Sequence, residues 1–404
     1  MTPAAATTTG LLDGVRVLDL TNVLAGPVAG YQLALLGADV VKVEMPGTGD
    51  LARQLGADPD LSARGLGASF LAQNGGKRSV TVNLKTDGGR DVFRRLLGTA
   101  DVLLENFRPG VLERLGFGWE GLRRDHPGLV YCAVSGFGST GPESDRPAYD
   151  QVVQGLSGIM SVTGSPGTAP LRVGYPVCDS IGGLAAAFSI AAALVRKQRT
   201  GEGAFLDVSM LDAALSTMGW VVSDYLVAGR TPEPMGNENR TSAPSGTFAT
   251  ADGALNIAAN RQEQWERLCV AIGREDLRRD ARFGTRDRRK EYREVLRSAL
   301  EETLRQKPAS HWDAVLREAG VPAAPVVSVP EALDSPQVRH RSLVTTHASA
   351  AGEVALVGLP THVDGAAVSP SSPPPVLGEH TDEVLGSLGL TADDIAALRA
   401  EGAV

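Results

Sequence analysis

The sequence is poor in cysteine, and its few cysteines form no recognisable pattern. Cys132, Cys178 and Cys269 are odd in number and widely spaced in a chain of 404 residues. Such a set indicates neither a disulfide framework nor a zinc site, and it is typical of a protein from a reducing compartment. The six histidines also show no ligand spacing. We therefore expect a cytoplasmic protein that holds no metal.

Several motifs that would indicate a function directly are also absent. The turn after the first expected strand lacks GxGxxG, and no P-loop, GxSxG or HExxH occurs. The formal charge is −8 and no basic run carries interleaved aromatics, which disfavours a nucleic-acid partner. The longest apolar run, residues 183–195, is too short to span a bilayer and predicts a buried helix, and MTPAAATTTG at the start shows no export signal. We expect small-molecule substrates, with neither nucleic acid nor membrane as a partner.

The pattern of apolar segments predicts an α/β protein. Strands expected at residues 15–20, 38–44, 79–84, 101–106 and 129–138 alternate with helical segments. This alternation is typical of a parallel sheet covered by helices on both faces. Between residues 226 and 328 the alternation gives way to short strands and helices. The length alone favours two domains.

The predicted fold is a large Rossmann-like parallel-sheet domain, built from both chain ends, plus a smaller α+β domain. Residues 1–10 are expected to be disordered. The large domain should take residues 11–225 and, with a C-terminal helix, 329–404, and the small domain should take residues 226–328. Within the small domain, Ser310 and Asp313 predict a capping box for a helix that ends near Gly320.

One acid stands alone in the apolar stretch LRVGYPVCDSIGGLAAAFSIAAALV, residues 171–195. Asp179 has two explanations. It, or Ser180, is the N-cap of the helix that follows, since Asp and Ser are preferred caps. Alternatively it is a reactive carboxylate, kept ionised by the helix dipole and able to attack an activated acyl group. Gly182 and Gly183 would then let a bulky ligand, or another backbone, come close.

Several motifs occur together and in order along the chain. They include GKRSVTVNLKT, DVLLENFRPGVLERLGFGWE, YCAVSGFGSTGP, RPAYDQVVQGLSGIMSVTG, VCDSIGG and LGEHTDEVL. From Leu11 to Leu390 the chain resembles the class III CoA-transferases, of the formyl-CoA transferase and carnitine CoA-transferase type. The combination of ENFRPG with the stretch around Asp179 is the strongest part of this resemblance.

The resemblance implies a function, a mechanism and a set of site residues. Asp179 would carry the acyl group as a mixed anhydride, and no cofactor would be needed beyond the coenzyme A thioester that is a substrate. The other substrate would be a carboxylic acid, and the assembly an obligate homodimer of interlocked rings. Cations at this site can neutralise the CoA phosphates, although each of them has solvated surface charge as its alternative reading. The matching CoA-contact positions are Leu24, Ala25, Val82, Asn83, Leu84, Lys85, Asn106, Phe107, Arg108, Arg114, Pro147, Ala148, Tyr149 and Asp150.

The sequence departs from this pattern in places, and rival functions remain open. Leu24 and Asn22 replace a glutamine and a histidine, Met45 replaces an arginine, and GNENRTSAPSG stands where a glycine-rich lid is expected near residues 237–246. These changes argue against formate or oxalate as the acid. An α-methylacyl-CoA racemase would need two acid/base groups, but Tyr149 occupies the position of the racemase histidine. The second rival is a non-catalytic acyl-CoA-binding protein, which would not need Asp179.

The acid that accepts CoA is not specified by these motifs. Small dicarboxylates are the leading candidates, alongside carnitine-like and aromatic acids. The cations that could pair with a distal carboxylate are Arg172, Arg240 and Arg261.

Overall fold

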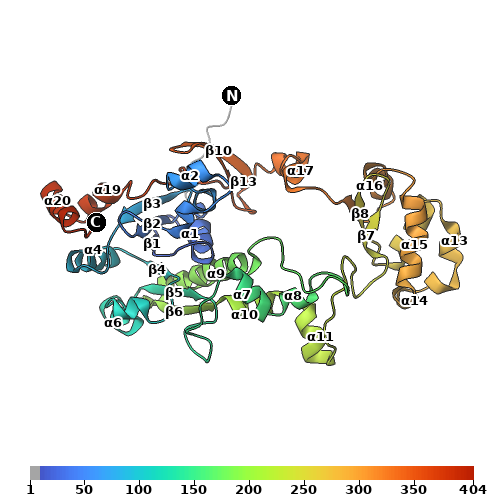
Figure 1. Ribbon diagram of the computed structural model, residues 1–404, viewed down its shortest axis with the longest axis horizontal. Helices are drawn as coiled ribbons and strands as arrows, with labels where there is room; N and C mark the ends of the chain where they lie inside the picture. Colours follow the sequence, from blue (N-terminus) through green and yellow to red (C-terminus); the bar gives the residue numbers. More distant parts are fainter. Residues whose placement is uncertain (1–9) are drawn as a thin grey trace. The chain divides into compact units, whose positions relative to one another are not determined.

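The computed structural model describes residues 10–404 (Figure 1). The segment expected to be disordered, residues 1–10, lies outside the described residues except for Gly10. The chain divides into two compact units. The larger unit takes the chain up to residue 159 together with residues 172–230 and 336–404, and the smaller unit takes residues 160–171 and 231–335. The sequence pattern suggested 226–328 for the small domain, and it gave no sign that residues 160–171 belong with it.

The larger unit contains a six-stranded parallel sheet in the order β3-β2-β1-β4-β5-β6. The prediction of a Rossmann-like parallel sheet is confirmed. The direction in which the chain adds strands reverses between β1 and β4, which makes this the switch point of the sheet. The strands are β1 (Arg16–Asp19), β2 (Asp39–Glu44), β3 (Lys77–Thr81), β4 (Val102–Glu105), β5 (Val130–Ser135) and β6 (Ala204–Ser209).

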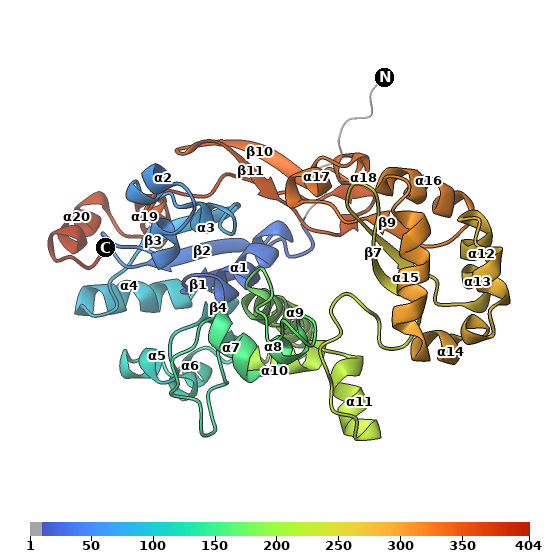
Figure 2. The ribbon, with the colours of Figure 1, turned by 45° about the vertical axis from the view of Figure 1, so that its right-hand side comes forward.

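Both faces of this sheet are buried, which explains why its strands are so apolar. On β4, Val102 and Leu104 face one core while Leu103 faces the other. The first core is completed by α1 (Ala25–Leu35), α9 (Val177–Thr200) and α10 (Met210–Thr217). The second core is completed by α4 (Asp87–Leu97), α6 (Trp119–Asp125), α19 (Thr381–Ser387) and α20 (Ala392–Ala400) (Figure 2). The end of the chain therefore packs on the sheet with which the chain began.

The remaining elements of the larger unit are short. Two hairpins, β10 with β11 and β12 with β13, follow α18. The bounds are α2 (Pro59–Ala63), α3 (Ala68–Leu71), α5 (Val111–Arg114), α7 (Asp150–Leu156), α11 (Trp220–Ala228), α18 (Pro336–His340), β10 (Val344–Ser349), β11 (Gly352–Val357), β12 (His362–Val363) and β13 (Ala366–Ala367), with a 3-10 helix at Leu51–Gln54.

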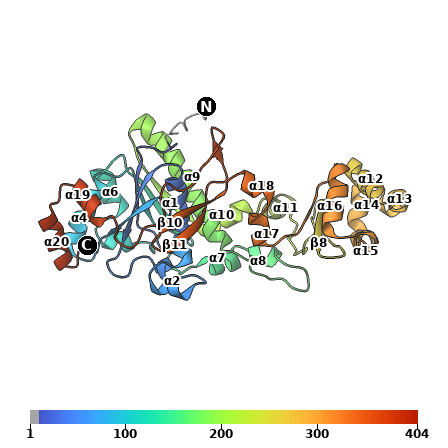
Figure 3. The same ribbon diagram turned by 90° about the horizontal axis from the view of Figure 1, so that it is seen from above.

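Helix α9 is long and apolar enough, by composition, to cross a membrane. It instead packs on β5 and β6 and runs beside α1 and α10 (Figure 3). Cys178, Ala186 and Ile190 on its inner side are fully buried. Its length and apolar character are those of a core helix, as the sequence predicted.

The smaller unit is α+β, as expected. Its three antiparallel strands are β7 (Ser245–Ala249), β8 (Ala254–Ala258) and β9 (Ala323–Pro325). The core contains Trp265, Phe283 and Leu300. Its helices are α12 (Gln262–Ala271), α13 (Glu275–Arg279), α14 (Arg286–Glu291), α15 (Arg293–Leu304), α16 (Ala309–Glu318) and α17 (Val329–Leu333), with a 3-10 helix at Ala281–Phe283, and α8 (Ile159–Val162) lies where the two units meet along the chain.

Two local predictions are wrong. The capping box of Ser310 and Asp313 does not form, because α16 begins at Ala309 with Pro308 at its N-cap. Both residues therefore lie inside the helix, where Asp313 pairs with Arg317. The segment YDQVVQGLSGIMSVTG, residues 149–164, has the sequence pattern of one helix. It forms two, α7 and α8, because Gly158 between them has a φ of 82°, which interrupts a right-handed helix.

Candidate active site

The predicted site residues of the larger unit gather at the carboxyl edge of the parallel sheet. Leu24 and Ala25 follow β1, residues 82–85 follow β3, residues 106–108 follow β4, and residues 147–150 follow β5. Asp179 lies at the start of α9, which runs back from this edge before β6. In open α/β sheets this edge, at the switch point, is where ligands bind.

Asp179 is the third residue of α9 and does not cap it. The helix begins at Val177, its N-cap is Pro176, and no side chain of the cap accepts a hydrogen bond. Ser180 is not the cap either, since its hydroxyl donates to the Pro176 carbonyl at 2.9 Å. The expectation that Asp179 or Ser180 is the N-cap is therefore wrong.

The cap of α9 comes from another helix. Asp150, the first residue of α7, is buried. Its Oδ1 accepts from the Cys178 N–H at 2.9 Å and lies 3.5 Å from the Asp179 nitrogen. Its Oδ2 accepts from Gln154 Nε2 at 2.7 Å and lies 3.6 Å from an Arg172 nitrogen. Because Asp150 accepts from the N–H groups at the start of α9, the carboxyl of Asp179 is not needed as a cap.

The environment of Asp179 favours its protonated form. Burial, and then the charge of Asp150, raise the pKa of Asp179 to about 7. The sequence argument relied on the helix dipole to keep this acid ionised, and it is wrong in direction, because burial and a like charge outweigh the dipole here. A carboxyl with this pKa still ionises near neutral pH, and as a carboxylate it is more basic than an ordinary aspartate.

The two glycines after Asp179 serve helix packing. A Cβ on Gly183 would lie 2.5 Å from the Ala25 carbonyl, and one on Gly182 would lie 3.0 Å from Met210 Cγ. Of the two roles open to these glycines, the approach of another backbone is therefore the one observed. The contact also sets the start of α1 against α9 one turn after Asp179.

Asn106 joins the two sides of the switch point. Its Oδ1 accepts from the Asn22 N–H and its Nδ2 donates to the Asn22 carbonyl, both at 2.8 Å. The loop after β4 is thereby tied to the loop after β1. The side-chain amide of Asn106 is used in this link between two loops that lie far apart in the sequence.

Three predicted cations remain accessible at the same edge. Lys85, Arg108 and Arg114 are exposed, and among the described residues none of them is held in an ion pair. The other predicted cations differ: Arg172 faces Asp150, whereas Arg240 and Arg261 belong to the smaller unit. The contacts of individual residues with CoA stay predictions.

The comparison with known proteins now decides the family. A family model described as CoA-transferase family III matches residues 12–381. The chain belongs to CoA-transferase family III. The resemblance stated from the motifs is confirmed, and the protein is a CoA-transferase.

Family III relatives align with this chain over most of its length. It is 40% identical to an acetyl-CoA:oxalate CoA-transferase of Acetobacter aceti, over 88% of this chain and 90% of that protein. It is 39% identical to a succinate–glutarate CoA-transferase of Agrobacterium fabrum, over 93% and 95%. A solved CAIB/BAIF family protein from Brucella suis has a TM-score of 0.84 and 35% identity, over 94% of this chain and all of that one.

The raised pKa of Asp179 has a consequence for stability. The folded value of about 7 lies above the ordinary 3.8, so ionisation of this group costs folding free energy as pH rises from about 4, and the full cost is reached above about 7. Asp179→Asn removes that cost. We expect the variant to be more stable than wild type at pH 8, by about 1–4 kcal/mol, and equally stable near pH 3.5, in denaturant titrations. Equal stability at both pH values would contradict the raised pKa. As a control, Asp150→Ala should lose about 1 kcal/mol, the usual cost of removing a cap.

Proposed function

We propose that this family III CoA-transferase moves CoA from an acyl-CoA thioester to a small dicarboxylic acid, with Asp179 as the covalent nucleophile. The observation that supports the proposal is that two neighbouring acids, Asp150 and Asp179, have different roles. Asp150 holds the start of α9, and Asp179 stands beside it at the ligand-binding edge of the sheet, with a carboxyl that does not cap the helix and a pKa of about 7.

The reaction begins with attack by the Asp179 carboxylate on the thioester carbonyl. The C–S bond breaks, CoA leaves as its thiolate, and an aspartyl–acyl anhydride remains. The thiolate then attacks the Asp179 acyl carbon, which releases the donor acid and leaves an aspartyl–CoA thioester. The acceptor carboxylate attacks this thioester, and CoA thiolate leaves again. Attack of the thiolate on the acceptor's acyl carbon gives the new acyl-CoA and regenerates Asp179.

Each attack passes through a tetrahedral oxyanion that needs hydrogen-bond donors. The backbone N–H groups of residues 180–183, which follow Asp179 in the chain, are candidates for this purpose. The Ser180 N–H is committed to the Pro176 carbonyl at 3.0 Å, so this donor is not free. The Asp179 N–H, 3.5 Å from Asp150 Oδ1, is only weakly engaged, which makes it a candidate donor to the oxyanion.

The choice of a dicarboxylate rests on charge and on relatives. The accessible Lys85, Arg108 and Arg114 can pair with the phosphates of CoA, and Arg172, 43% exposed, offers a cation near the two acids. The relatives from Acetobacter and Agrobacterium are named for oxalate and for succinate and glutarate, all dicarboxylates. Together these favour an acceptor with a second carboxylate.

The racemase alternative loses support from the structure. Asp150, its one remaining candidate for a second acid/base group, is buried and has hydrogen bonds on both oxygens. Tyr149 is 66% exposed and lies where a histidine would be required. A protein that only binds acyl-CoA is distinguished by its tolerance of changes at Asp179.

A substrate screen with one variant tests the nucleophile. Purified enzyme with succinyl-CoA and a panel of mono- and dicarboxylic acids should form a new CoA thioester from a dicarboxylate, detected by mass spectrometry. Asp179→Asn should slow that exchange by several orders of magnitude, because an amide is a poor nucleophile toward a thioester, while acyl-CoA affinity by calorimetry stays within a few-fold. Near-normal exchange by the Asn variant would refute the role of Asp179.

The pH dependence tests the pairing of the two acids. The limb of kcat/KM on the acid side should have its midpoint near pH 7 and level off about one pH unit higher, because the carboxylate form attacks. Asp150→Asn keeps an oxygen for the Cys178 N–H but removes the like charge, which lowers the pKa of Asp179. The limb should therefore move to lower pH by roughly one unit. A limb that stays in place would mean that the titrating group is not Asp179 beside Asp150.

We also propose that the enzyme is a homodimer. Helix α11 has no buried residue, and Trp220, Leu226 and Val227 on it are 62%, 74% and 86% exposed. Phe188 on α9 is 76% exposed. Apolar surface of this extent is typical of an interface, and a second copy of the chain is the commonest occupant. Sedimentation should give twice the mass of the 42.2 kDa chain, and Val227→Asp should weaken the dimer. A stable, active monomer would contradict it.

A further inference from the structure

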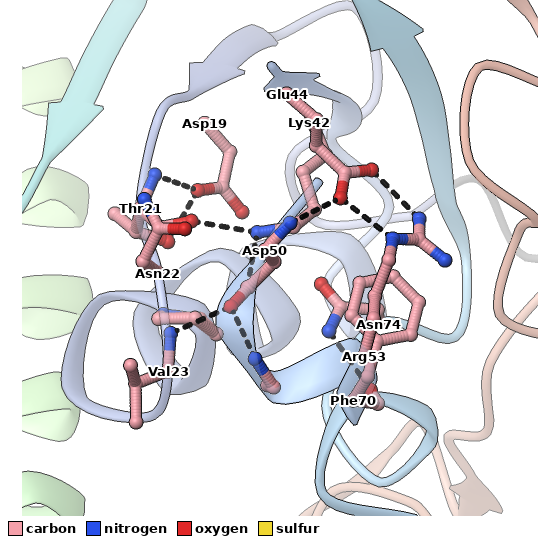
Figure 4. Close-up of polar contacts among 12 residues, drawn as sticks. Asp19, Thr21, Asn22, Val23, Lys42, Glu44, Asp50, Arg53, Phe70 and Asn74 are labelled. Carbon is pink, nitrogen blue, oxygen red and sulfur yellow. Dashed lines mark hydrogen bonds and ion pairs between the residues drawn. The ribbon is translucent and has the colours of Figure 1, made fainter. Parts of the chain in front are cut away.

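A cluster of buried ions lies beside the chain segment that joins β1 to α1, apart from the two acids of the proposed mechanism. Figure 4 shows Asp19, Lys42, Glu44, Asp50 and Arg53 of this cluster. Its members form three ion pairs: Lys77 with Asp19 at 2.8 Å, Lys42 with Asp50 at 2.9 Å and Arg53 with Glu44 at 2.7 Å. Every side chain is at most 2% exposed. We call these six residues the buried ion cluster. No reacting group of the proposed mechanism belongs to it.

The charged forms of Asp19, Lys42 and Glu44 are favoured despite their burial, whereas burial lowers the pKa of Lys77 to about 8. Burial alone would raise the pKa of Asp19, but Lys77 and Lys42 lower it below its ordinary value. Burial alone would lower the pKa of Lys42, but Asp19, Asp50 and Glu44 raise it. Buried ion pairs generally stabilise a fold no better than apolar residues of the same size. The role of the cluster is therefore to be sought in what its members contact.

Two of the pairs end on one short turn, residues 21–23 after β1. Lys42 Nζ donates to the Thr21 carbonyl at 2.7 Å. Asp50 Oδ1 accepts from the Val23 N–H at 2.9 Å, and Asp19 Oδ1 accepts from the Thr21 N–H at 2.9 Å. The residue between them, Asn22, is held by Asn106 as described above. Every residue of the turn is thus fixed through its backbone by a side chain.

The turn needs this support because its backbone is strained. Val23 has a φ of 67°, a left-handed conformation that a β-branched residue rarely adopts. Such strain persists only where the surroundings over-determine it, and it marks functional segments. Thr21, Asn22 and Val23 together receive bonds from elements on both sides of the switch point, so the conformation is over-determined here.

The turn transmits its position to Asp179 through α1. Lys77 Nζ donates to the Pro27 carbonyl in the first turn of α1 at 3.1 Å. The next contact is the Ala25 carbonyl against Gly183, where no room is left even for a methyl group. A displacement of the turn would therefore press on α9 one turn after Asp179. Reacting groups tolerate little displacement, since about 1 Å costs on the order of 10²-fold in rate.

We propose that Lys42 and Asp50 are positioning residues: they hold the strained turn at residues 21–23, and through α1 they fix the place of Asp179. This inference rests on the proposed function, because it assigns the effect to the step that Asp179 performs. It also makes a statement about the turn that does not depend on activity.

The test replaces ion pairs by apolar pairs of similar size. Lys42→Met with Asp50→Leu removes these charges and the anchors that they provide at Thr21 and Val23. Glu44→Leu with Arg53→Met removes a similarly buried pair whose hydrogen bonds do not reach residues 21–23. We expect the first double variant to lower kcat about 10- to 100-fold with acyl-CoA at saturation. The control pair should change kcat less than 3-fold at a similar melting temperature.

A conservative variant and an exchange measurement complete the test. Lys42→Met with Asp50→Asn keeps an oxygen for the Val23 N–H but still lacks the Lys42 bond to Thr21, so it should restore part of kcat, even if the leucine variant folds poorly. Hydrogen exchange of peptides that cover residues 20–28 should be faster in the leucine variant than in the control. Equal losses of kcat in the two apolar pairs, or unchanged exchange of the turn, would overturn the proposal. If wild type transfers no CoA, the proposed function fails, whereas the exchange result still decides whether the cluster holds the turn.

Discussion

The hydrogen bond from the Cys178 N–H to the Asp150 carboxylate is the interaction on which the rest of the site depends. A helix start requires acceptors for its free N–H groups, and in α9 the nearest acid, Asp179, could have served. Because Asp150 arrives from α7 and takes that place, the Asp179 carboxyl does not have to accept from the helix start. The Asp150 carboxylate stabilises the start of α9, and the neighbouring Asp179 carboxylate is available for the reaction.

This arrangement sets two electrostatic effects against each other. The positive end of α9 favours an ionised Asp179, while burial and the Asp150 charge disfavour it and prevail. The resulting carboxyl titrates near neutral pH and is destabilising when ionised. Such a cost is tolerable only if the surroundings are rigid, and the close contact of Gly183 with Ala25 and the buried ion cluster provide that rigidity.

The sequence predicted the features that depend on local pattern. The parallel sheet follows from apolar strands such as residues 101–106, and Asp179 was found because it is the one acid in an apolar segment. Capping was misjudged at both helices for which it was predicted, for a common reason. Preferences for cap residues describe contacts between residues about three positions apart. The first N–H groups of α9 are instead capped by a residue 28 positions away, and α16 begins at Ala309, before Ser310, with Pro308 at its N-cap.

The buried ion cluster could not be predicted as a unit either. Lys42 inside the apolar strand VVKVE was a visible signal, since a lysine there must be buried or the strand exposed. The other side chains that hold the turn at residues 21–23 come from distant parts of the chain. Asp50 follows β2 and Asn106 follows β4, and only the tertiary fold brings them to the turn beside Lys42. The strain at Val23 leaves no trace in the sequence, because valine is a poor residue for that conformation.

Trapping of the covalent intermediate tests the central claim most directly. Hydroxylamine added during turnover attacks the activated acyl carbon of the enzyme and converts the aspartyl anhydride or thioester into a hydroxamate. If Asp179 is the nucleophile that Asp150 leaves free, peptide mass mapping should find the hydroxamate at Asp179 in wild type and in Asp150→Asn, only when acyl-CoA is present, and never in Asp179→Asn. A hydroxamate on another residue, or continued CoA exchange with Asp179 unmodified, would contradict the account.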